Sequence, residues 1–239
     1  MAGHTLSEWS DRVRELLGNP SDGRIGDAAL QEHVRGAIRR FSADRPAITY
    51  VDFAGNGASY DILVSSLTGW VNGFSTVGAI EYPQGQRIPV YLDPQSWVMY
   101  PDTSLPTAVR LLTWTPASGQ TARVYYTLPW AIPDATPTTD VIPDTSYDPV
   151  ARLAGYFGAL QLAGRASGTQ RDSFAGADLV GESTEETRWM DLSRSFLASY
   201  TEHVGGTEGE PPAMATTDWD ARSTWIETGH RFLLRPSRR

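Results

Sequence analysis

The sequence predicts an α+β fold: a small antiparallel bundle of four main helices, an inserted β-sandwich or barrel-like module, and an extended C-terminal arm. Apolar residues recur at helical spacing in residues 1–45 and again in residues 147–205. Between these stretches, short runs of β-branched and aromatic residues alternate with turn signals, which indicates strands. Residues 206–239 combine a run rich in Gly, Glu and Pro with aromatic residues too few to form a core.

Two amphipathic helices are expected before residue 45. A capping box of Thr5 and Glu8 starts the first helix, which ends at Gly18. Asp27 is the expected N-cap of the second helix, which stops before Arg45-Pro46. The predicted buried stripes are Leu6, Trp9, Val13, Leu16 and Leu17 in the first, and Leu30, Val34, Ala37, Ile38 and Phe41 in the second.

Residues 46–140 are predicted to be the β module, followed by a linker at 141–146. Asn56-Gly57 is a strong hairpin signal, and the turn Ala117–Gln120 predicts a second hairpin. Short strands at this spacing favour a sandwich or a small barrel. The expected strands cover residues 48–53, 60–63, 78–83, 88–92, 97–100, 108–115 and 121–128.

Two further helices are expected after the linker, and together with residues 1–45 they complete a helical core at 147–205. Asp148-Pro149 is expected to start the third helix, because proline suits the first helical position. A polar connection at 164–181 and a capping box of Ser183 and Glu186 then lead into the fourth helix, which Gly205-Gly206 ends. The predicted apolar faces are Leu153, Ala154, Phe157, Leu160 and Gln161, and then Trp189, Leu192, Phe196, Tyr200 and Val204.

The composition limits the classes of function. The chain has 239 residues, a net charge of −8 and no cysteine, so it offers neither disulfides nor thiolate metal ligands. The negative charge argues against non-specific DNA binding by the whole surface. All 20 basic residues are arginine, so a phosphate-binding loop with its lysine is absent.

Residues capable of catalysis do not form a recognisable constellation. The four histidines lack metal-binding spacing, and His33 is expected on a solvated helix face beside Glu32. Ser75 lies in Gly73–Gly78, which lacks the Gly-x-Ser-x-Gly spacing of a nucleophile elbow. We therefore expect no catalytic, cofactor-binding or metal-binding residues and no enzyme activity.

Three local motifs carry a family resemblance. They are Arg45-Pro46 after the second helix, Trp-x-x-Gly-Phe-Ser at Trp70–Ser75, and Glu-Tyr-Pro at Glu81–Pro83. With the Thr/Ile/Pro-rich linker at Thr138–Pro143 and the two helices after it, the chain resembles head–tail adaptor (connector or head-completion) proteins of tailed bacteriophages and related prophages. The resemblance covers the order of elements from Leu6 to Val204. The large β module and the Trp-bearing tail depart from that pattern.

The resemblance implies a structural protein of the virion neck, at the head–tail interface, that is present in the host cytoplasm during assembly. Such adaptors form a ring of about twelve copies beneath the portal protein, and a closed ring requires head-to-tail contacts. The ring extends the DNA channel, through which DNA passes without specific binding, and offers an attachment surface to a tail-completion or tail-terminator protein. No cofactor and no membrane are implied.

Two sets of residues are candidates for contacts with partners. The arm at 206–239 is expected to dock on the portal protein through Trp219, Trp225, Arg231, Phe232, Leu233 and Arg235; a frayed terminus or a strand folded back on the β module is the alternative. Trp70, Phe74 and Tyr82 are either core of the β module or an exposed contact patch. Two other functions stay open, a minor tail or capsid-decoration protein and a β-sandwich carbohydrate- or receptor-binding module.

Overall fold

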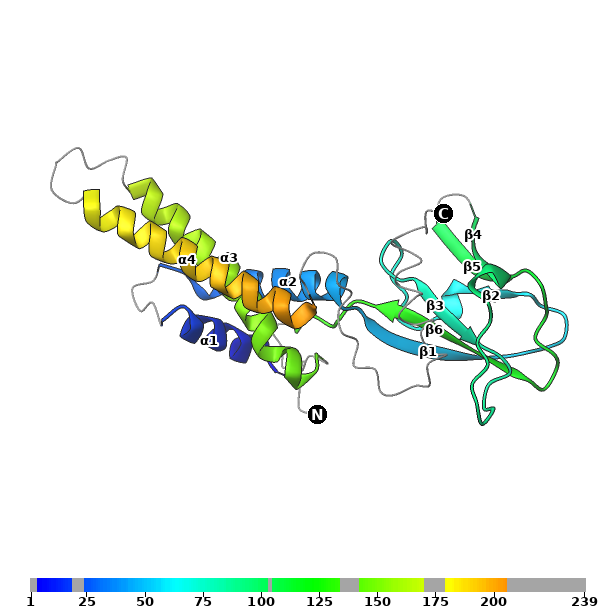
Figure 1. The fold of residues 1–239 in the computed structure, drawn as a ribbon. Helices are drawn as coiled ribbons and strands as arrows, with labels where there is room; N and C mark the ends of the chain where they lie inside the picture. The colour runs from blue at the N-terminus through cyan, green and yellow to red at the C-terminus, as the bar shows by residue number, and fades with distance from the viewer. Residues whose placement is uncertain (1–3, 19–23, 103–104, 134–141, 170–178, 206–239) are drawn as a thin grey trace, which may run out of the picture. The chain divides into compact units, whose positions relative to one another are not determined.

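A computed structural model describes residues 4–18, 24–102, 105–133, 142–169 and 179–205 (Figure 1). These residues form two compact units. The helical unit consists of the described residues within Met1–Arg45 and Trp130–Ala213, and the β unit is Pro46–Pro129. The β unit therefore lies between two chain segments that together build the helical unit.

The predicted α+β class is confirmed, with four α-helices and two small antiparallel sheets in the described part of the chain. The helices are α1 (Leu6–Leu16), α2 (Asp27–Asp44), α3 (Asp144–Thr169) and α4 (Leu179–Val204). The strands are β1 (Ala47–Ala54), β2 (Asp61–Leu63), β3 (Val77–Glu81), β4 (Trp97–Asp102), β5 (Leu105–Leu111) and β6 (Thr121–Leu128), with short 3-10 turns at Val64–Ser66 and Pro94–Ser96.

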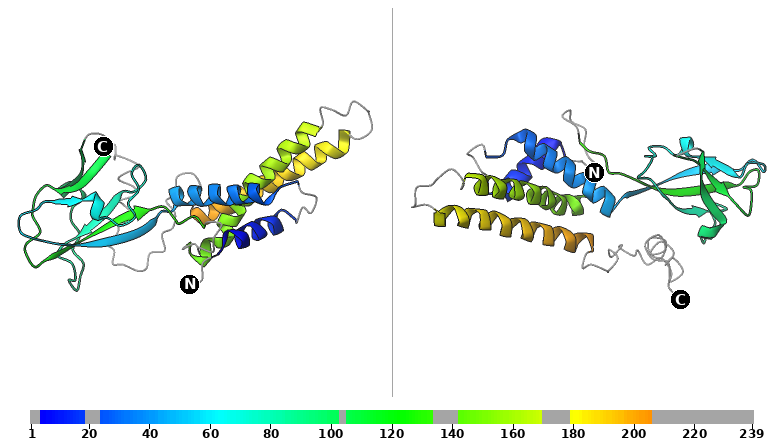
Figure 2. Two further views of the ribbon diagram at one scale, coloured as in Figure 1. Left: turned by 180° about the vertical axis from the view of Figure 1, so that it is seen from behind. Right: turned by 90° about the horizontal axis from the view of Figure 1, so that it is seen from above.

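Helix α3 is the centre of the helical unit. It contacts α1, α2 and α4, and it lies between α4 and the other two helices (Figure 2). Close packing depends on small residues here: a Cβ at Gly155 would lie 3.0 Å from Cε2 of Phe196 on α4. Because α3 packs on three neighbours, its buried surface is wider than the predicted stripe and includes Val150, Ala151, Ala159, Leu162 and Ala163.

The first two helices largely match their predictions. The backbone N–H of Thr5 donates to the Glu8 carboxylate at 2.7 Å, and the N–H of Glu8 donates to Oγ1 of Thr5 at 3.3 Å, so the capping box is confirmed. The predicted stripes are buried, apart from Leu16, which is partly buried. The predicted N-cap Asp27 is wrong by one residue, because Gly26 caps α2 and Asp27 begins it.

Both later helices begin earlier than predicted. Helix α3 begins at Asp144, so Pro149 is its sixth residue rather than its first, and its missing N–H removes the helical hydrogen bond to the Thr145 carbonyl. Asp148 instead accepts hydrogen bonds from Arg12 and Arg152. The helix also runs through Gly164 to Thr169, where a connection was predicted. Helix α4 begins at Leu179, so Ser183 lies inside the helix and is not its N-cap. Tertiary packing commonly overrides local helix preferences of this size.

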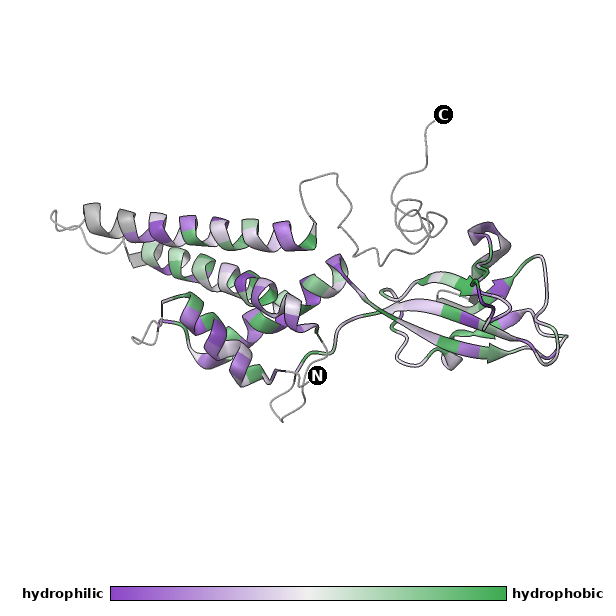
Figure 3. Cartoon of the chain, turned by 60° about the horizontal axis from the view of Figure 1, so that its bottom comes forward, coloured by the Kyte–Doolittle hydropathy of each residue, from purple (hydrophilic) through white to green (hydrophobic). Residues whose placement is uncertain are grey.

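The β unit is a sandwich of two three-stranded antiparallel sheets, ordered β1-β6-β3 and β2-β5-β4. Hydrophobic and hydrophilic residues alternate along its strands (Figure 3). Side chains from both sheets pack on each other to form the core: Ile62, Leu67, Val77, Ile80, Val109, Leu111, Ala122, Val124 and Tyr126. Each sheet therefore has one buried face and one outer face.

Neither predicted hairpin forms. Strand β1 pairs with β6, and β2 pairs with β5, so Asn56-Gly57 carries the chain from one sheet to the other. The N–H of Gly55 extends the β1–β6 ladder by donating to the Gln120 carbonyl at 2.7 Å, and glycine is needed there because a Cβ would lie 2.4 Å from the Ala117 carbonyl oxygen. The turn Ala117–Gln120 likewise crosses between the sheets rather than joining paired strands.

The predicted strand at 88–92 is also wrong. It contributes a single bridge, between Tyr91 and Glu81, flanked by hydrogen bonds from the Tyr82 N–H to the Val90 carbonyl and from the Leu92 N–H to the Ile80 carbonyl. Pro89 has no N–H to extend this pairing. The segment therefore covers the edge of β3 as a loop.

The boundary between the units differs from the predicted one. Trp130 and Ile132 were assigned to the β module but pack on the helical core, and Ile142, assigned to the linker, is buried there. The indole Nε1–H of Trp130 donates to the Arg45 carbonyl at 2.6 Å, and its backbone N–H donates to Oγ of Ser42 at 3.0 Å. The chain leaves the helical unit after Arg45 and returns to it at Trp130, and these hydrogen bonds hold the two positions together.

Candidate functional site

The Trp70–Ser75 motif forms the loop before β3. Trp70 is half-buried against the core of the β unit, with its ring centroid 6.0 Å from that of Tyr126 and its Nε1–H donating to Oδ1 of Asn72 at 3.0 Å. Oγ of Ser75 accepts a hydrogen bond from the backbone N–H of Val71 at 3.0 Å. Ser75 is buried, so its hydroxyl serves the loop. Phe74 is half-buried in the same loop.

The Glu81–Pro83 motif anchors the loop after β3, which contains a cis peptide bond before Pro83. The Tyr82 ring stacks on Trp114 with 4.1 Å between centroids. Its hydroxyl accepts from the backbone N–H of Ala117 at 2.9 Å and donates to the Gln120 side chain. Tyr82 and Trp70 are thus both partly buried and pack against the core of the β unit.

Glu81 is the most deeply buried carboxylate among the described residues, at 5 % exposure. It accepts hydrogen bonds from the Tyr125 hydroxyl at 3.1 Å and from the backbone N–H of Gly85 at 3.3 Å. Burial, with a further contribution from Glu81, raises the pKa of Tyr125 to about 12. The pKa of Tyr91 is raised for the same two reasons. Sequence patterns gave no indication of this cluster, because its members are far apart along the chain.

The described histidines, His4, His33 and His203, all belong to the helical unit. His33 is not on a fully solvated face as predicted: it is half-buried, and its Nε2 lies 2.8 Å from Oε1 of Gln161 on α3. Nε2 of His203 lies 3.2 Å from Oγ of Ser146, and burial lowers the pKa of His203. These contacts join helices to one another.

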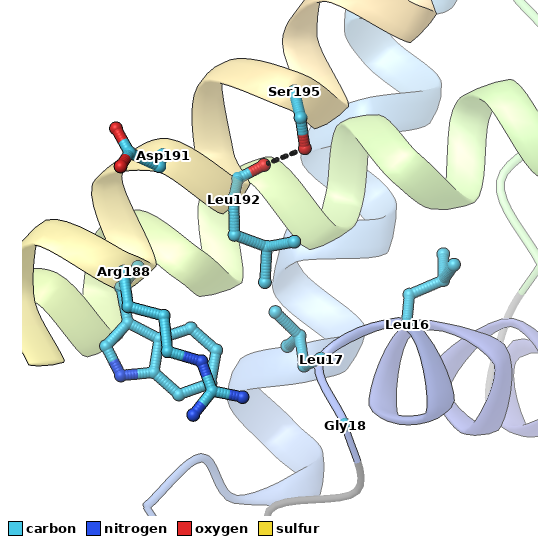
Figure 4. Close-up of a pocket in the computed structure, with 8 residues that line it drawn as sticks. Leu16, Leu17, Gly18, Arg188, Asp191, Leu192 and Ser195 are labelled. Atoms are coloured by element: carbon cyan, nitrogen blue, oxygen red, sulfur yellow. Dashed lines mark hydrogen bonds between the residues drawn. The ribbon is translucent and has the colours of Figure 1, made fainter.

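A pocket of about 370 Å³ opens between the end of α1 and the side of α4 (Figure 4). Its apolar lining comes from Leu16, Leu17, Trp189 and Leu192, and its polar lining comes from Arg188, Asp191 and Ser195, with Gly18 beside them. Oγ of Ser195 donates to the Leu192 carbonyl at 2.8 Å, and Asp191 forms an ion pair with Arg194 at 3.1 Å. The apolar part of this lining favours binding of an apolar side chain in the pocket.

Within the described part of the chain, no group of three or more His, Asp or Glu side chains has metal-binding geometry, and no helix is long and apolar enough to cross a membrane. The predicted arm residues Trp219, Trp225, Arg231, Phe232, Leu233 and Arg235 lie outside the described residues.

Comparisons with known proteins give little beyond this geometry. No protein-family model matches the chain, and no curated protein matches it. Among solved structures, it is similar to a chain described as the neck of a native GTA particle computed with C12 symmetry. The two are 16% identical, the match covers 79% of this chain and 93% of that chain, and the TM-score is 0.26. A score this low carries no argument about fold or function.

Proposed function

We propose that the protein is a structural virion protein of the neck, a head–tail adaptor that forms a ring under the portal protein and offers an attachment surface to the tail. The observation that supports it best is the order of elements. Two helices, a β unit and two more helices follow one another from Leu6 to Val204, which is the order on which the family resemblance rests. The ring, its portal partner and its location in the virion neck belong to this proposal.

The motif residues support a structural role. Arg45 lies where the chain leaves the helical unit, and its carbonyl is tied to Trp130. Trp70 and Tyr82 hold the loops on either side of β3. The three motifs of the resemblance therefore stabilise the junction and the β unit, which suits a protein whose function depends on shape.

The arm at 206–239 is proposed to bind the portal protein through its aromatic and arginine residues. The Gly-Gly-Thr-Glu-Gly-Glu-Pro-Pro run gives reach. Large aromatic anchors and arginines pairing with acidic groups are typical of binding hot spots. Removing the arm should leave the melting temperature nearly unchanged and abolish portal binding, while a tail-side partner still binds.

The test is to mix the purified protein with the portal protein of the same particle and to examine the mixture by negative-stain electron microscopy. The proposal expects a ring stacked coaxially on the portal with the full chain, and bare portals with a chain that ends at Gly205. Raising the ionic strength should slow association more than it speeds dissociation, because the arginines act through charge. Bare portals with the full chain would contradict the proposed function.

A further inference from the structure

Exposed apolar side chains are concentrated in the β unit. Among the described residues, every large apolar side chain that is well exposed belongs to this unit except Leu197 on α4. Seven of them lie on the outer faces of the two sheets: Ile48, Tyr50, Tyr60, Leu63, Val98, Tyr100 and Leu112. Contiguous exposed apolar surface on a soluble protein indicates an interaction site.

The outer face of the β2-β5-β4 sheet, here called face B, carries five of these seven side chains. Leu63 and Tyr100 flank Ala108 across the sheet, and Leu63 is 57% exposed. The next row places Arg110 between Asp61 and Val98. Tyr60 and Leu112 extend the surface beyond that row, since the N–H of Leu111 donates to the Tyr60 carbonyl.

The outer face of the β1-β6-β3 sheet, here called face A, repeats the same chemistry. Ile48, which is 55% exposed, lies opposite Thr127, and Tyr50 lies opposite Tyr125. In the next row, Arg123 lies opposite Asp52. Since the two sheets pack through their inner faces, face A and face B lie on opposite sides of the sandwich.

On each face, an arginine and an aspartate form an ion pair with each other. On face B, Nε and Nη2 of Arg110 donate to the two carboxylate oxygens of Asp61 at 2.8 and 2.9 Å. On face A, Arg123 donates to both oxygens of Asp52 at 2.7 and 2.9 Å. The guanidinium carbons also lie over tyrosine rings, 3.8 Å from the Tyr100 centroid and 4.0 Å from the Tyr50 centroid.

Because the exposed charges on each face pair within that face, they indicate which kind of partner binds there. Copies of a chain with a net charge of −8 repel one another, so a contact between copies requires surfaces that bring no unpaired charge together. A partner of opposite charge would be matched better by exposed, unpaired charges. Both faces are apolar, and their charged side chains pair within the same face. They therefore fit a second copy of the same chain.

We infer that face A of one copy packs against face B of the next, so that the β unit makes the subunit contact. This inference rests on the proposed function in assigning that contact to the ring. Two different faces on opposite sides give head-to-tail association, which closes into a ring or continues as a filament. Three strands span roughly 300 Å² on face B, and less is open on face A, where Ala79 and Glu81 of β3 are buried; both areas are below the ~800 Å² per partner of a stable interface. A single contact is thus weak. We therefore expect assembly to rise steeply with protein concentration, because several contacts must form together.

The cysteine-free sequence allows a direct crosslinking test. Copies carrying Ile48→Cys and one affinity tag are mixed with copies carrying Val98→Cys and a second tag, at concentrations where the full chain associates. A short bis-maleimide should link the two kinds of copy to each other. Each variant alone should give no more product than Ser118→Cys, which places a thiol on an exposed turn away from both faces.

A second variant measures how much the contact contributes. Leu63→Asp leaves the fold intact, because the side chain is mostly exposed, but it places a charge in the apolar contact. The concentration at half-assembly should rise by at least ~10-fold in sedimentation experiments. Leu197→Asp, the matched change on the helical unit, should leave that concentration within about twofold of the parent value.

The outcomes separate this inference from the proposed function. Linkage between Val98→Cys copies alone would show face B packing on itself, and it would overturn the pairing of A with B. Rings on the portal without mixed crosslinks would also overturn it, while the proposed function stands. Mixed crosslinks without portal binding would support the A-to-B contact and contradict the adaptor role. A glycan or another virion protein bound at Tyr60 and Tyr100, with no mixed crosslinks, would overturn the inference.

Discussion

The helical unit and the β unit use their apolar residues in opposite ways. In the helical unit, large side chains such as Trp9 and Phe41 are buried, and surface charges pair both within a helix, as Arg14 does with Asp11, and between helices, as Arg12 does with Asp148. In the β unit, apolar side chains remain on both outer faces, and the ion pairs join neighbouring strands.

This difference follows from geometry. A bundle in which α3 touches three neighbours can cover all of its apolar stripes. A sandwich of two three-stranded sheets buries one face of each sheet and leaves the other outside. Polar residues would suffice on those outer faces for solubility alone. Their apolar content therefore indicates that the helical unit is built for stability and the β unit for contact.

The largest expected effect lies in the helical core. Phe196→Ala should destabilise the helical unit by about 3–5 kcal/mol, because the ring is only 6% exposed and packs on Gly155. Phe157→Ala should cost about 1–2 kcal/mol, since that ring is only partly buried. Chemical denaturation followed by helical circular dichroism measures both. Equal losses below about 1 kcal/mol would place Phe196 at a surface.

A smaller effect is expected at the junction of the units. Trp130→Phe keeps an aromatic ring near Phe41, whose centroid lies 6.1 Å away, but removes the hydrogen bond to the Arg45 carbonyl. The helical unit should lose about 1–2 kcal/mol, because a half-buried carbonyl then lacks its donor. The same denaturation experiment measures it. A loss confined to the β unit would show that Trp130 belongs to that unit after all.

The smallest expected effect concerns pH and the β unit. With the pKa of Tyr125 raised to about 12, the folded state keeps the phenol proton where the unfolded chain, with a pKa near 10, has lost it. This contribution to stability is complete below pH ~10 and falls as pH rises toward ~12. Tyr125→Phe should flatten that part of the stability curve, and ultraviolet difference spectra should lose one tyrosinate that forms near pH 12. An unchanged spectrum above pH ~10 in the variant would contradict the assignment.

The sequence predicts the helices better than the sheets because helical signals are local. The capping box of Thr5 and Glu8 and the stripe from Trp9 to Val13 lie within one or two turns, and both are confirmed. The starts of α3 and α4 differ from the prediction, because both helices begin before their strongest local signals. Tertiary packing, such as the pairing of Asp148 with Arg12 of α1, decides these ends and is invisible in a local pattern.

Strand pairing is non-local, and there the predictions were wrong. Asn56-Gly57 and Ala117–Gln120 are real turns, but each leads to the other sheet, because β1 and β6 pair with each other as far as Gly55 and Gln120. The cross-strand pair of Arg123 and Asp52 spans 71 positions, and the pair of Arg110 and Asp61 spans 49. Spacing along the chain cannot reveal such pairs, so the two outer faces emerge only from the fold.

Replacing Pro46–Pro129 with a short linker tests most directly whether the helical unit provides stability and the β unit provides the contact between copies. A short linker suffices because Arg45 and Trp130 contact each other. Circular dichroism melting and sedimentation over a range of concentrations should then be compared with those of the full chain. The account predicts that the shortened chain still melts cooperatively as a helical protein and stays monomeric where the full chain assembles. A shortened chain that assembles like the full chain, or that loses cooperative helical melting, would contradict it.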